Sequence, residues 1–379
     1  MSATSKADET LLAWRQFCRD LERAGESALA APGAASELDR AEGVRYLTRL
    51  LRVALEMQLE WADPDCPGFY QASHVTAKIG ADNPDNHYLN ATISPLRRYR
   101  IKGRRGTTPI LTFATKANRY ATDGTMASTG ELAIEDMQVA PDGVFEIVVA
   151  KERPDGAPNW LPMEEDSSLI VVRQTFLDRS TERVNELSIE LADGRPEPAL
   201  LTPAALAQGL QRTVGFVDGT AKTFVRWAEI FKAEQLNRLE THDQAMFQRA
   251  GGDPAIHYLH GYWRIEADEV LEIKSAIPEC QAWNFQINNY WMESLDYRAY
   301  RIHVNKATAK YDPDGGVTIV VAARDPGYGN WIETAGHTHG TMLWRWTNAE
   351  QHPTPSCRIV KLKSLNAPDS RRRRRAGGR

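Results

Sequence analysis

Apolar residues recur at helical spacing in two stretches of residues 1–62, which predicts two amphipathic helices. Ala31-Pro32-Gly33 separates the two stretches. The prolines and the glycine of segment 63–68 should end the second helix, because proline lacks a backbone donor and glycine favours turn geometry. We therefore expect an N-terminal helical segment over residues 1–62. The apolar positions of its second helix are Tyr46, Leu47, Leu50, Leu51, Val53, Leu55 and Leu59.

Residues 63–195 change to short apolar runs bounded by turn residues such as Asp142-Gly143 and Asp193-Gly194. Runs of this length between such turns are typical of antiparallel β-strands, and together they predict a β-sandwich. The expected strands are 99–102, 110–113, 145–149, 169–176 and 187–191.

Segment 196–256 returns to a helical pattern. Thr202-Pro203 supplies an N-cap followed by proline at the first helical position, and a second, longer helix is expected over 220–249. The glycines and proline of segment 251–254 close this helical insertion, after which strands resume over 257–362. The expected strands are 262–265, 270–273, 283–290, 300–304, 317–322 and 341–346.

The two β-rich segments repeat one another. The run Ile147-Val148-Val149-Ala150 recurs as Ile319-Val320-Val321-Ala322, an offset of 172 residues (319 minus 147). Asn159-Trp160 returns as Asn330-Trp331 with a slip of one residue. A repeat of this size is too long for a solenoid unit and indicates two copies of one small domain. The predicted fold class is therefore mixed α and β, dominated by β, with tandem antiparallel β-sandwiches at 63–195 and 257–362.

Composition indicates the cellular location of the protein. The four cysteines include no pair at metal-ligand or redox spacing, which is typical of a reducing compartment. No segment approaches the roughly 20 apolar residues of a membrane span, and residues 1–10 lack the character of a secretory signal. We expect a cytoplasmic protein without a membrane partner, and the sequence assigns no oligomeric state.

Basic residues are concentrated at the C-terminus, in Arg371 to Arg375 and Arg379. The net charge is −4, and without these six arginines it becomes −10, with 40 basic residues (46 minus 6) against 50 acidic ones. We interpret segment 363–379 as a disordered, solvated tail. A nucleic-acid partner is not expected, because one short run lacks the basic face and the aromatic residues of a nucleic-acid-binding domain.

The predicted strand 283–290 carries the most informative side chains. With a period of two, one face is apolar and the other presents the carboxamides of Asn284, Gln286 and Asn288. Carboxamides donate and accept hydrogen bonds without charge, which suits recognition of hydroxyls, carbonyls or carboxylates in a cleft. An ordinary solvent-facing surface is the alternative, although asparagine is a poor strand former.

Acidic and aromatic residues follow this strand directly, among them Trp291, Glu293 and Asp296. A carboxylate beside aromatic rings can act as a general acid or base near neutral pH, and we favour Glu293 for that role. A surface carboxylate in a salt bridge is the alternative for each acid.

Two histidines lie two residues apart in Gly336-His337-Thr338-His339-Gly340. With His303 they are candidate ligands of a cupin-type metal site, but such a site also needs a nearby carboxylate, and the next glutamate is Glu350. We therefore assign no metal and no cofactor, and we favour His337 as the partner of a catalytic carboxylate.

Three further groups remain candidates for substrate binding, each with a structural alternative. A turn-capping segment precedes Tyr88, an asparagine-tryptophan pair occurs in both copies, and an arginine recurs at matching strand positions, 173 and 345. The duplicated pair favours internal braces, and the arginines suit either a buried carboxylate or a bound anion. The residues concerned are Asp85, Asn86, His87, Asn330, Trp331 and Arg345.

Several motifs together resemble a bacterial family known as the twelve-fourteen domain of unknown function. The resemblance runs from about residue 40 to 347 and implies a jelly-roll-like sandwich for the C-terminal part, with no established activity. His339 departs from it, because similar sequences lead us to expect arginine there. The matching motifs are Asn83-Pro84-Asp85-Asn86, Gly261-Tyr262-Trp263, Trp283-Asn284-Phe285-Gln286, Asn288-Asn289-Tyr290-Trp291-Met292-Glu293-Ser294, Asp325-Pro326-Gly327 and Asn330-Trp331 to Arg345.

Two classes of function remain open. In the first, the protein is an enzyme that processes a small polar or sugar-like molecule by acid-base chemistry, as a hydrolase, lyase or isomerase. In the second, it is a non-catalytic protein that binds such a molecule in the same cleft. Phosphate-binding loops, dinucleotide fingerprints, nucleophile elbows and His-Glu-x-x-His motifs are missing from the sequence, so nucleotide-dependent chemistry has no support.

Overall fold

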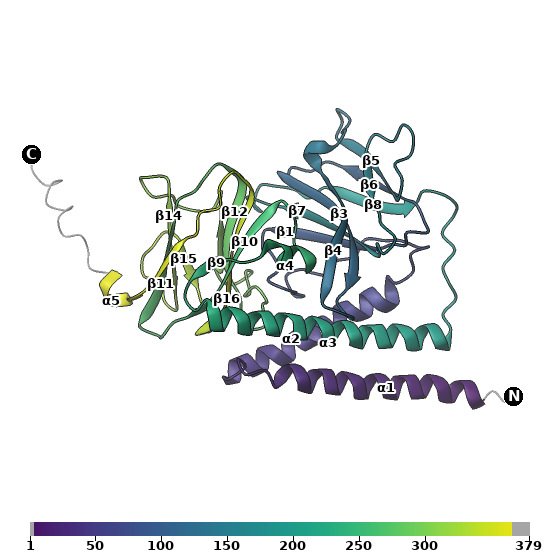
Figure 1. The fold of residues 1–379 in the computed structure, drawn as a ribbon, viewed down its shortest axis with the longest axis horizontal. Coiled ribbons are helices and arrows are strands. Elements are labelled where there is room, and N and C mark those ends of the chain that lie inside the picture. The colour runs from purple at the N-terminus through teal and green to yellow at the C-terminus, as the bar shows by residue number, and fades with distance from the viewer. Residues whose placement is uncertain (1–3, 366–379) are drawn as a thin grey trace, which may run out of the picture. The chain divides into compact units, whose positions relative to one another are not determined.

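The computed structural model describes residues 4–365, and the chain divides into two compact units (Figure 1). The N-terminal unit comprises Met1–Arg226 with Asp243–Pro254, and the C-terminal unit comprises Trp227–His242 with Ala255–Arg379. The short helix α5 (Leu362–Leu365) ends the described chain. Most of the predicted basic tail, including its arginines, therefore lies outside the described residues.

Helices α1 (Thr4–Leu29) and α2 (Glu37–Leu55) confirm the predicted N-terminal helical segment. Ser36 and Asp39 form a capping box at the start of α2, because each side chain accepts a hydrogen bond from the other's backbone N–H. At its C-terminal end α2 widens into a single π-helical turn, η1 (Glu56–Glu60), which the Trp61 N–H closes by donating to the Glu56 carbonyl at 2.8 Å.

The N-terminal unit contains two four-stranded sheets, in the orders β1-β7-β3-β4 and β6-β5-β2-β8. Apolar side chains from both sheets, including Phe113 and Val172 from one and Ile101 and Ile147 from the other, form one buried core between them. The unit is therefore a β-sandwich. Its elements are β1 (Asn86–Thr92), β2 (Tyr99–Arg104), β3 (Ile110–Arg119), β4 (Thr125–Ala133), η2 (Ile134–Asp136), β5 (Val144–Ala150), β6 (Trp160–Pro162), β7 (Leu169–Thr175) and β8 (Glu186–Leu191).

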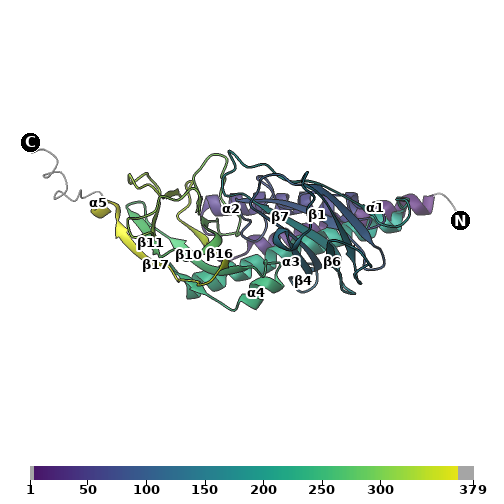
Figure 2. The same cartoon turned by 90° about the horizontal axis from the view of Figure 1, so that it is seen from above.

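The C-terminal unit is also a sandwich, with sheet orders β13-β12-β16-β10-β9 and β15-β14-β11-β17. Figure 2 shows its strands β11 and β17 side by side. Four buried tryptophans fill much of its core, and the indoles of Trp283 and Trp344 stack with ring centroids 4.9 Å apart. Its strands are β9 (Leu239–Thr241), β10 (Ile256–Arg264), β11 (Glu269–Ser275), β12 (Cys280–Ile287), β13 (His303–Asn305), β14 (Val317–Ala322), β15 (Trp331–Glu333), β16 (His339–Ala349) and β17 (Ser356–Lys361).

The two sandwiches have the same strand order, which confirms the predicted duplication. The order β6-β5-β2-β8 corresponds to β15-β14-β11-β17, and β1-β7-β3 corresponds to β10-β16-β12. A parallel strand pair also recurs, with Val148 opposite Trp160 and Val320 opposite Trp331.

Asparagine and tryptophan act as identical braces in both copies. The Asn159 carboxamide donates to the carbonyls of Gln138 and Glu146 and accepts from the Gln138 N–H, at 2.7–2.9 Å. Asn330 makes the same three bonds with Lys310 and Thr318, at 2.7–3.0 Å.

The tryptophan that follows each asparagine completes the brace. Its indole N–H donates to the last residue of the neighbouring strand, Ala150 or Ala322, at 2.9 Å. Both side chains therefore fix loops to the sandwich, and these contacts favour the structural role for Asn330 and Trp331 over the substrate-binding role.

The structure corrects several element predictions, among them strand 300–304, which is shortened and shifted to β13. Segment 203–249 holds one continuous helix, α3 (Pro203–Glu234), followed by β9 and the short helix α4 (Gln244–Arg249), instead of two long helices. The predicted turn before Tyr88 ends earlier than expected, because strand β1 already begins at Asn86. Strand β12 ends at Ile287, three residues earlier than predicted, because the chain turns there.

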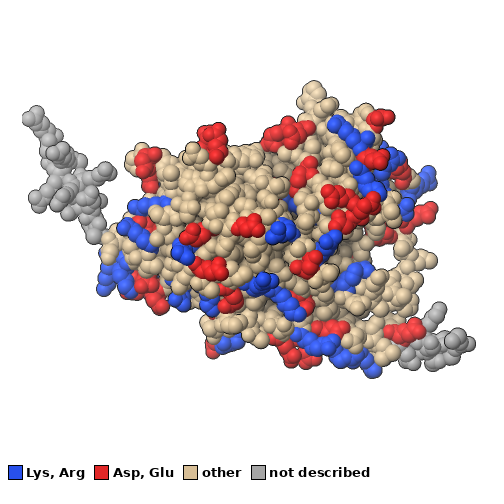
Figure 3. Space-filling view, viewed as in Figure 1, with Lys and Arg blue, Asp and Glu red and all other residues tan. Residues whose placement is uncertain are grey.

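Helix α3 supplies residues to both units, since the boundary between them falls after Arg226. Among the residues from 4 to 365, no helix combines the length and the apolar character needed to cross a bilayer. Acidic and basic side chains are interspersed over the face seen in Figure 3.

Candidate functional site

The three predicted carboxamides of the C-terminal unit lie in a buried layer. Asn284, Gln286 and Asn288 are at most 4% exposed, which excludes the solvent-facing interpretation. The opposite face of β12 packs in the core through Trp283, Phe285 and Ile287, as the alternation predicts.

Arg345 of β16 organises this layer. Its Nη1 group donates to Gln286 Oε1 at 2.5 Å and to Asn284 Oδ1 at 3.3 Å. Strands β12 and β16 bring these residues together, because Asn284 is directly opposite Arg345 in the antiparallel register. The arginine is 5% exposed, and these two carboxamides help to hold its guanidinium in place.

The layer continues as a directional chain of hydrogen bonds. Gln286 Nε2 donates to Asn288 Oδ1 at 2.6 Å, and Asn288 Nδ2 donates to Thr341 Oγ1 at 3.1 Å. Because each carboxamide accepts on one side and donates on the other, the amide orientations are fixed by the arginine at one end. The sequence prediction missed Thr341, which joins the layer only through the register of β16.

A tight turn follows the layer and places Glu293. The Met292 N–H donates to the Asn289 carbonyl and the Asn289 N–H donates to the Glu293 carbonyl. Asn289 Oδ1 accepts from the N–H groups of Trp291 and Glu293, both at 3.0 Å. Asn289 Nδ2 in turn donates to the Glu293 carboxylate at 2.9 Å. Glu293 is fully buried, and Trp291 is 1% exposed.

Met292 in this turn has a positive φ of 55° although it is not glycine. Left-handed backbone costs on the order of 1–2 kcal/mol for such a residue, and conformations of this kind cluster at functional sites. The strained turn therefore marks the surroundings of Glu293 as a candidate site. Asn289, which builds the turn, is the residue that reasoning from single side chains missed; its signal is the asparagine pair at 288–289.

The last turns of α3 cover one face of strand β10 in the same unit. The His260 ring stacks on Phe231, with ring centroids 4.7 Å apart, and Tyr290 donates its hydroxyl hydrogen to Glu229 at 2.7 Å. Burial, and to a smaller extent the positive charge of Arg345, lowers the pKa of His260 well below its ordinary value. This histidine is neutral near pH 7 and was not predicted from the sequence.

Asp296 and His337 lie in different surroundings from Glu293. Asp296 is partly exposed and binds Arg298 with both carboxylate oxygens, at 2.6 and 2.8 Å, which matches the salt-bridge alternative. His337 is 6% exposed, and its backbone N–H donates to the Thr334 carbonyl at the turn before β16. The predicted cooperation of His337 with Glu293 stays a prediction.

His339 begins strand β16 and bonds to the Tyr262 hydroxyl through Nδ1 at 2.6 Å. Within residues 4–365, no group of three or more histidine, cysteine, aspartate or glutamate side chains is arranged to hold a metal ion. The alternative of a cupin-type site at His303, His337 and His339 therefore gains no support.

Asp85, Asn86 and His87 belong to the other unit, where Asp85 directly precedes strand β1 and the other two begin it. The Asp85 N–H donates to Asn83 Oδ1 at 3.0 Å, and Asn86 Oδ1 accepts from the Thr175 hydroxyl at 2.8 Å. His87 is partly buried, and burial, followed by the charge of Arg179, lowers its pKa. The side chain that caps this turn is therefore that of Asn83, whereas Asn86 joins β1 to β7.

The fold and the repeated braces define a tandem-duplicated β-sandwich protein. The model of the family described as "Protein of unknown function (DUF1214)" matches residues 86–176 and 266–351, one stretch in each sandwich. The chain belongs to this family, which confirms the resemblance found in the sequence.

One similar solved structure is that of an uncharacterized protein from Burkholderia cenocepacia. The two chains are 48% identical, the match covers 94% of this chain and 99% of the other, and the TM-score is 0.91. The VPA0106 protein from Vibrio parahaemolyticus is more distant, at 11% identity and a TM-score of 0.49, over 84% of this chain and 98% of the other. No curated protein is significantly similar to the chain.

Proposed function

We propose that the C-terminal unit binds a small polar molecule, hydroxyl-bearing or carboxylate-bearing, at the layer formed by Asn284, Gln286, Asn288 and Arg345. The observation that carries this proposal is the hydrogen-bond chain from Arg345 through Gln286 and Asn288 to Thr341, which fixes a cation and several amides in one orientation. Groups that are fixed before binding lose little conformational freedom on contact with a ligand.

We further propose that the protein processes its ligand by acid-base chemistry with Glu293 as the proton-transferring residue. A buried carboxylate that is oriented by a carboxamide, on a strained turn directly after the layer, has the features of a general acid or base. His337 remains the proposed second group. The predicted cytoplasmic location, like the lack of a nucleic-acid partner, stays a prediction.

A non-catalytic binding protein is the second candidate function. It is favoured by the fact that Gln286 and Asn288 each use both their donor and acceptor groups within the protein. Such residues act as supports that orient a binding group, and binding requires no proton transfer.

Two variants separate these functions. A thermal-shift screen of sugars, polyols and hydroxy acids identifies a ligand, because a ligand at about 100 times its Kd stabilises the protein by about 2.7 kcal/mol. With that ligand, the Glu293→Gln variant should keep the thermal shift and lose turnover. Turnover is measured by mass spectrometry of the product. Gln286→Leu, which removes the acceptor that orients Arg345, should reduce the shift.

Glu272→Gln provides the matched control, because Glu272 is also buried but lies on the opposite sheet, in strand β11, where it pairs with Arg358 at 2.6 Å. Turnover by Glu293→Gln at the wild-type rate contradicts the acid-base role and leaves the binding function. An undiminished shift in Gln286→Leu contradicts the proposed binding layer.

A further inference from the structure

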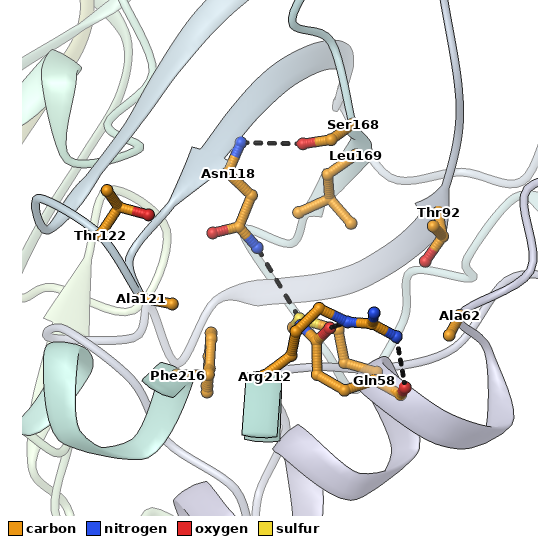
Figure 4. Close-up of a pocket in the computed structure, with 11 residues that line it drawn as sticks. Gln58, Ala62, Thr92, Asn118, Ala121, Thr122, Ser168, Leu169, Arg212 and Phe216 are labelled. Atoms are coloured by element: carbon orange, nitrogen blue, oxygen red, sulfur yellow. Dashed lines mark hydrogen bonds between the residues drawn. The ribbon is translucent and has the colours of Figure 1, made fainter. Parts of the chain in front are cut away.

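A cavity of about 440 Å³ opens within the N-terminal unit, where η1, α3 and the ends of β1, β3 and β7 meet (Figure 4). Its volume falls in the range of about 300–1,000 Å³ that is typical of small-molecule sites. None of the candidate residues derived from the sequence lines it, and it is distinct from the layer around Arg345, which belongs to the other unit.

The cavity has an apolar floor and a polar rim. Met57, Leu169 and Phe216 form the floor and are at most 5% exposed. Thr122 and Arg212 lie at the rim and are exposed to solvent. A ligand with an apolar body and one polar end would therefore place its body inside and its polar end near the opening.

Arg212 gives the cavity its charge, since the other side chains described as lining it are neutral. Its Nε group donates to Gln58 Oε1 at 3.0 Å, and Nη2 donates to the Gln58 carbonyl at 3.3 Å. These two bonds orient the guanidinium, and its other N–H groups can bind a carboxylate with two parallel hydrogen bonds. The lining charge favours a ligand with a single negative charge.

The backbone around Gln58 and α3 is built for this arrangement. Gln58 lies in the π-helical turn η1, and single π-turns within helices occur often at functional sites. Helix α3 approaches this turn closely at Gly209, where an added Cβ would lie 2.9 Å from the Gln58 carbonyl oxygen. Glycine at this position thus allows Arg212, three residues later, to reach Gln58.

We propose that this cavity is a second binding site, which takes a small organic monoanion consisting of a carboxylate and a compact apolar body. The carboxylate binds Arg212, and the apolar body packs on Met57, Leu169 and Phe216. The half-buried Asn118 side chain, which donates to the Met57 sulfur at 3.7 Å, adds a neutral polar group to the wall. This proposal does not depend on the proposed function of the C-terminal unit.

Benzoate tests the proposal, with the neutral benzamide and inorganic phosphate as comparisons, by isothermal titration calorimetry on the full chain. Benzoate should bind saturably, and the affinity for benzamide should be lower by about tenfold or more. Phosphate should not displace benzoate, since phosphate lacks an apolar body. Arg212→Gln should weaken benzoate binding by about tenfold or more, as expected for loss of hydrogen bonds to a charged group.

Two further variants complete the test. Arg226→Gln is the matched control, because Arg226 is exposed on the same helix and does not line the cavity, so its benzoate affinity should equal that of the wild type. Thr122→Trp should block the opening and weaken binding while Arg212 is kept. Absence of saturable benzoate binding, equal affinities for benzoate and benzamide, displacement by phosphate, or wild-type affinity in Arg212→Gln or Thr122→Trp would each overturn the proposal. The same holds if Arg226→Gln weakens binding as much as Arg212→Gln.

Discussion

Corresponding faces of the two sandwiches carry different chemistry on the same strands. Arg173 and Arg345 occupy equivalent positions in β7 and β16, and both are buried. Arg173 pairs with a carboxylate, that of Asp253 at 3.5 Å, whereas Arg345 donates to the carboxamides of Asn284 and Gln286.

The same difference appears one step along the layer. Lys116 of β3 corresponds to Asn288, the residue directly after β12 (288 minus 116 is 172). The lysine side chain is fully buried and pairs with Glu131 at 3.0 Å, and burial followed by the nearby charge of Arg173 lowers its pKa. Lys116 in the N-terminal copy thus corresponds to Asn288 in the C-terminal copy, which teaches that duplication kept the fold while the side chains of this layer diverged.

The largest effect should come from breaking an ion pair of the N-terminal copy. Arg173→Leu leaves the buried Asp253 without this guanidinium, and removal of one partner of a buried pair costs about 3–5 kcal/mol of unfolding free energy. Urea unfolding measures the loss. The double variant Arg173→Leu/Asp253→Leu should recover much of it, and a cost below about 1 kcal/mol in the single variant would show that the pair is not a structural element of this copy.

The braces test whether the two copies remain equivalent where their sequences agree. Asn159→Ala and Asn330→Ala each remove three hydrogen bonds to backbone groups, so each should lower the unfolding free energy by about 2–3 kcal/mol. Chemical unfolding of both variants provides the measurement. Clearly unequal losses would mean that one asparagine has taken on a further role, as the substrate-binding prediction for Asn330 requires.

The smallest expected effect is on the pH dependence of the unfolding free energy, in which the two copies should also differ. Because the pKa of His260 is lowered in the folded state, its contribution to stability is complete above about pH 6.5 and is lost as pH falls below that value. The loss should approach, at most, about 1.4 kcal/mol per pH unit.

The equivalent position in the N-terminal copy is Asn90, which does not titrate (260 minus 90 and 258 minus 88 are both 170). His260→Asn should therefore flatten the dependence of unfolding free energy on pH between about 6.5 and 5. Urea unfolding at several pH values measures the slopes. Identical slopes in the variant and the wild type would contradict the assignment of a buried neutral imidazole to this position.

Apolar runs were sufficient to find the central strands, because segments such as 147–150 and 319–322 are mostly buried, and the recurrence of these runs revealed the duplication. Strand β4 was missed, since its residues are mostly small or polar and only partly buried. Helix α3 was divided wrongly because its glycines resemble breakers. In fact an added Cβ at Gly219 would lie 2.0 Å from the Tyr120 carbonyl oxygen, so close packing explains this glycine.

The candidate site was predicted only in part. The alternation in β12 correctly separated an apolar face from a polar one, but periodicity along one strand does not reveal which distant residue lies opposite. The bond from Arg345 to Gln286 joins residues 59 positions apart. The cavity beside Arg212 is assembled from several separate segments without any sequence motif, so it could be found only in three dimensions.

Helix α3 has a consequence for how the molecule can be divided. The boundary between the units falls inside one unbroken helix, after Arg226. At that point the chain offers no loop in which a protease site or a truncation could separate the units without cutting the helix. Either half expressed alone would inherit a truncated helix with four unsatisfied carbonyl or amide groups at the cut. A division of the two copies at this boundary would therefore interrupt helix α3.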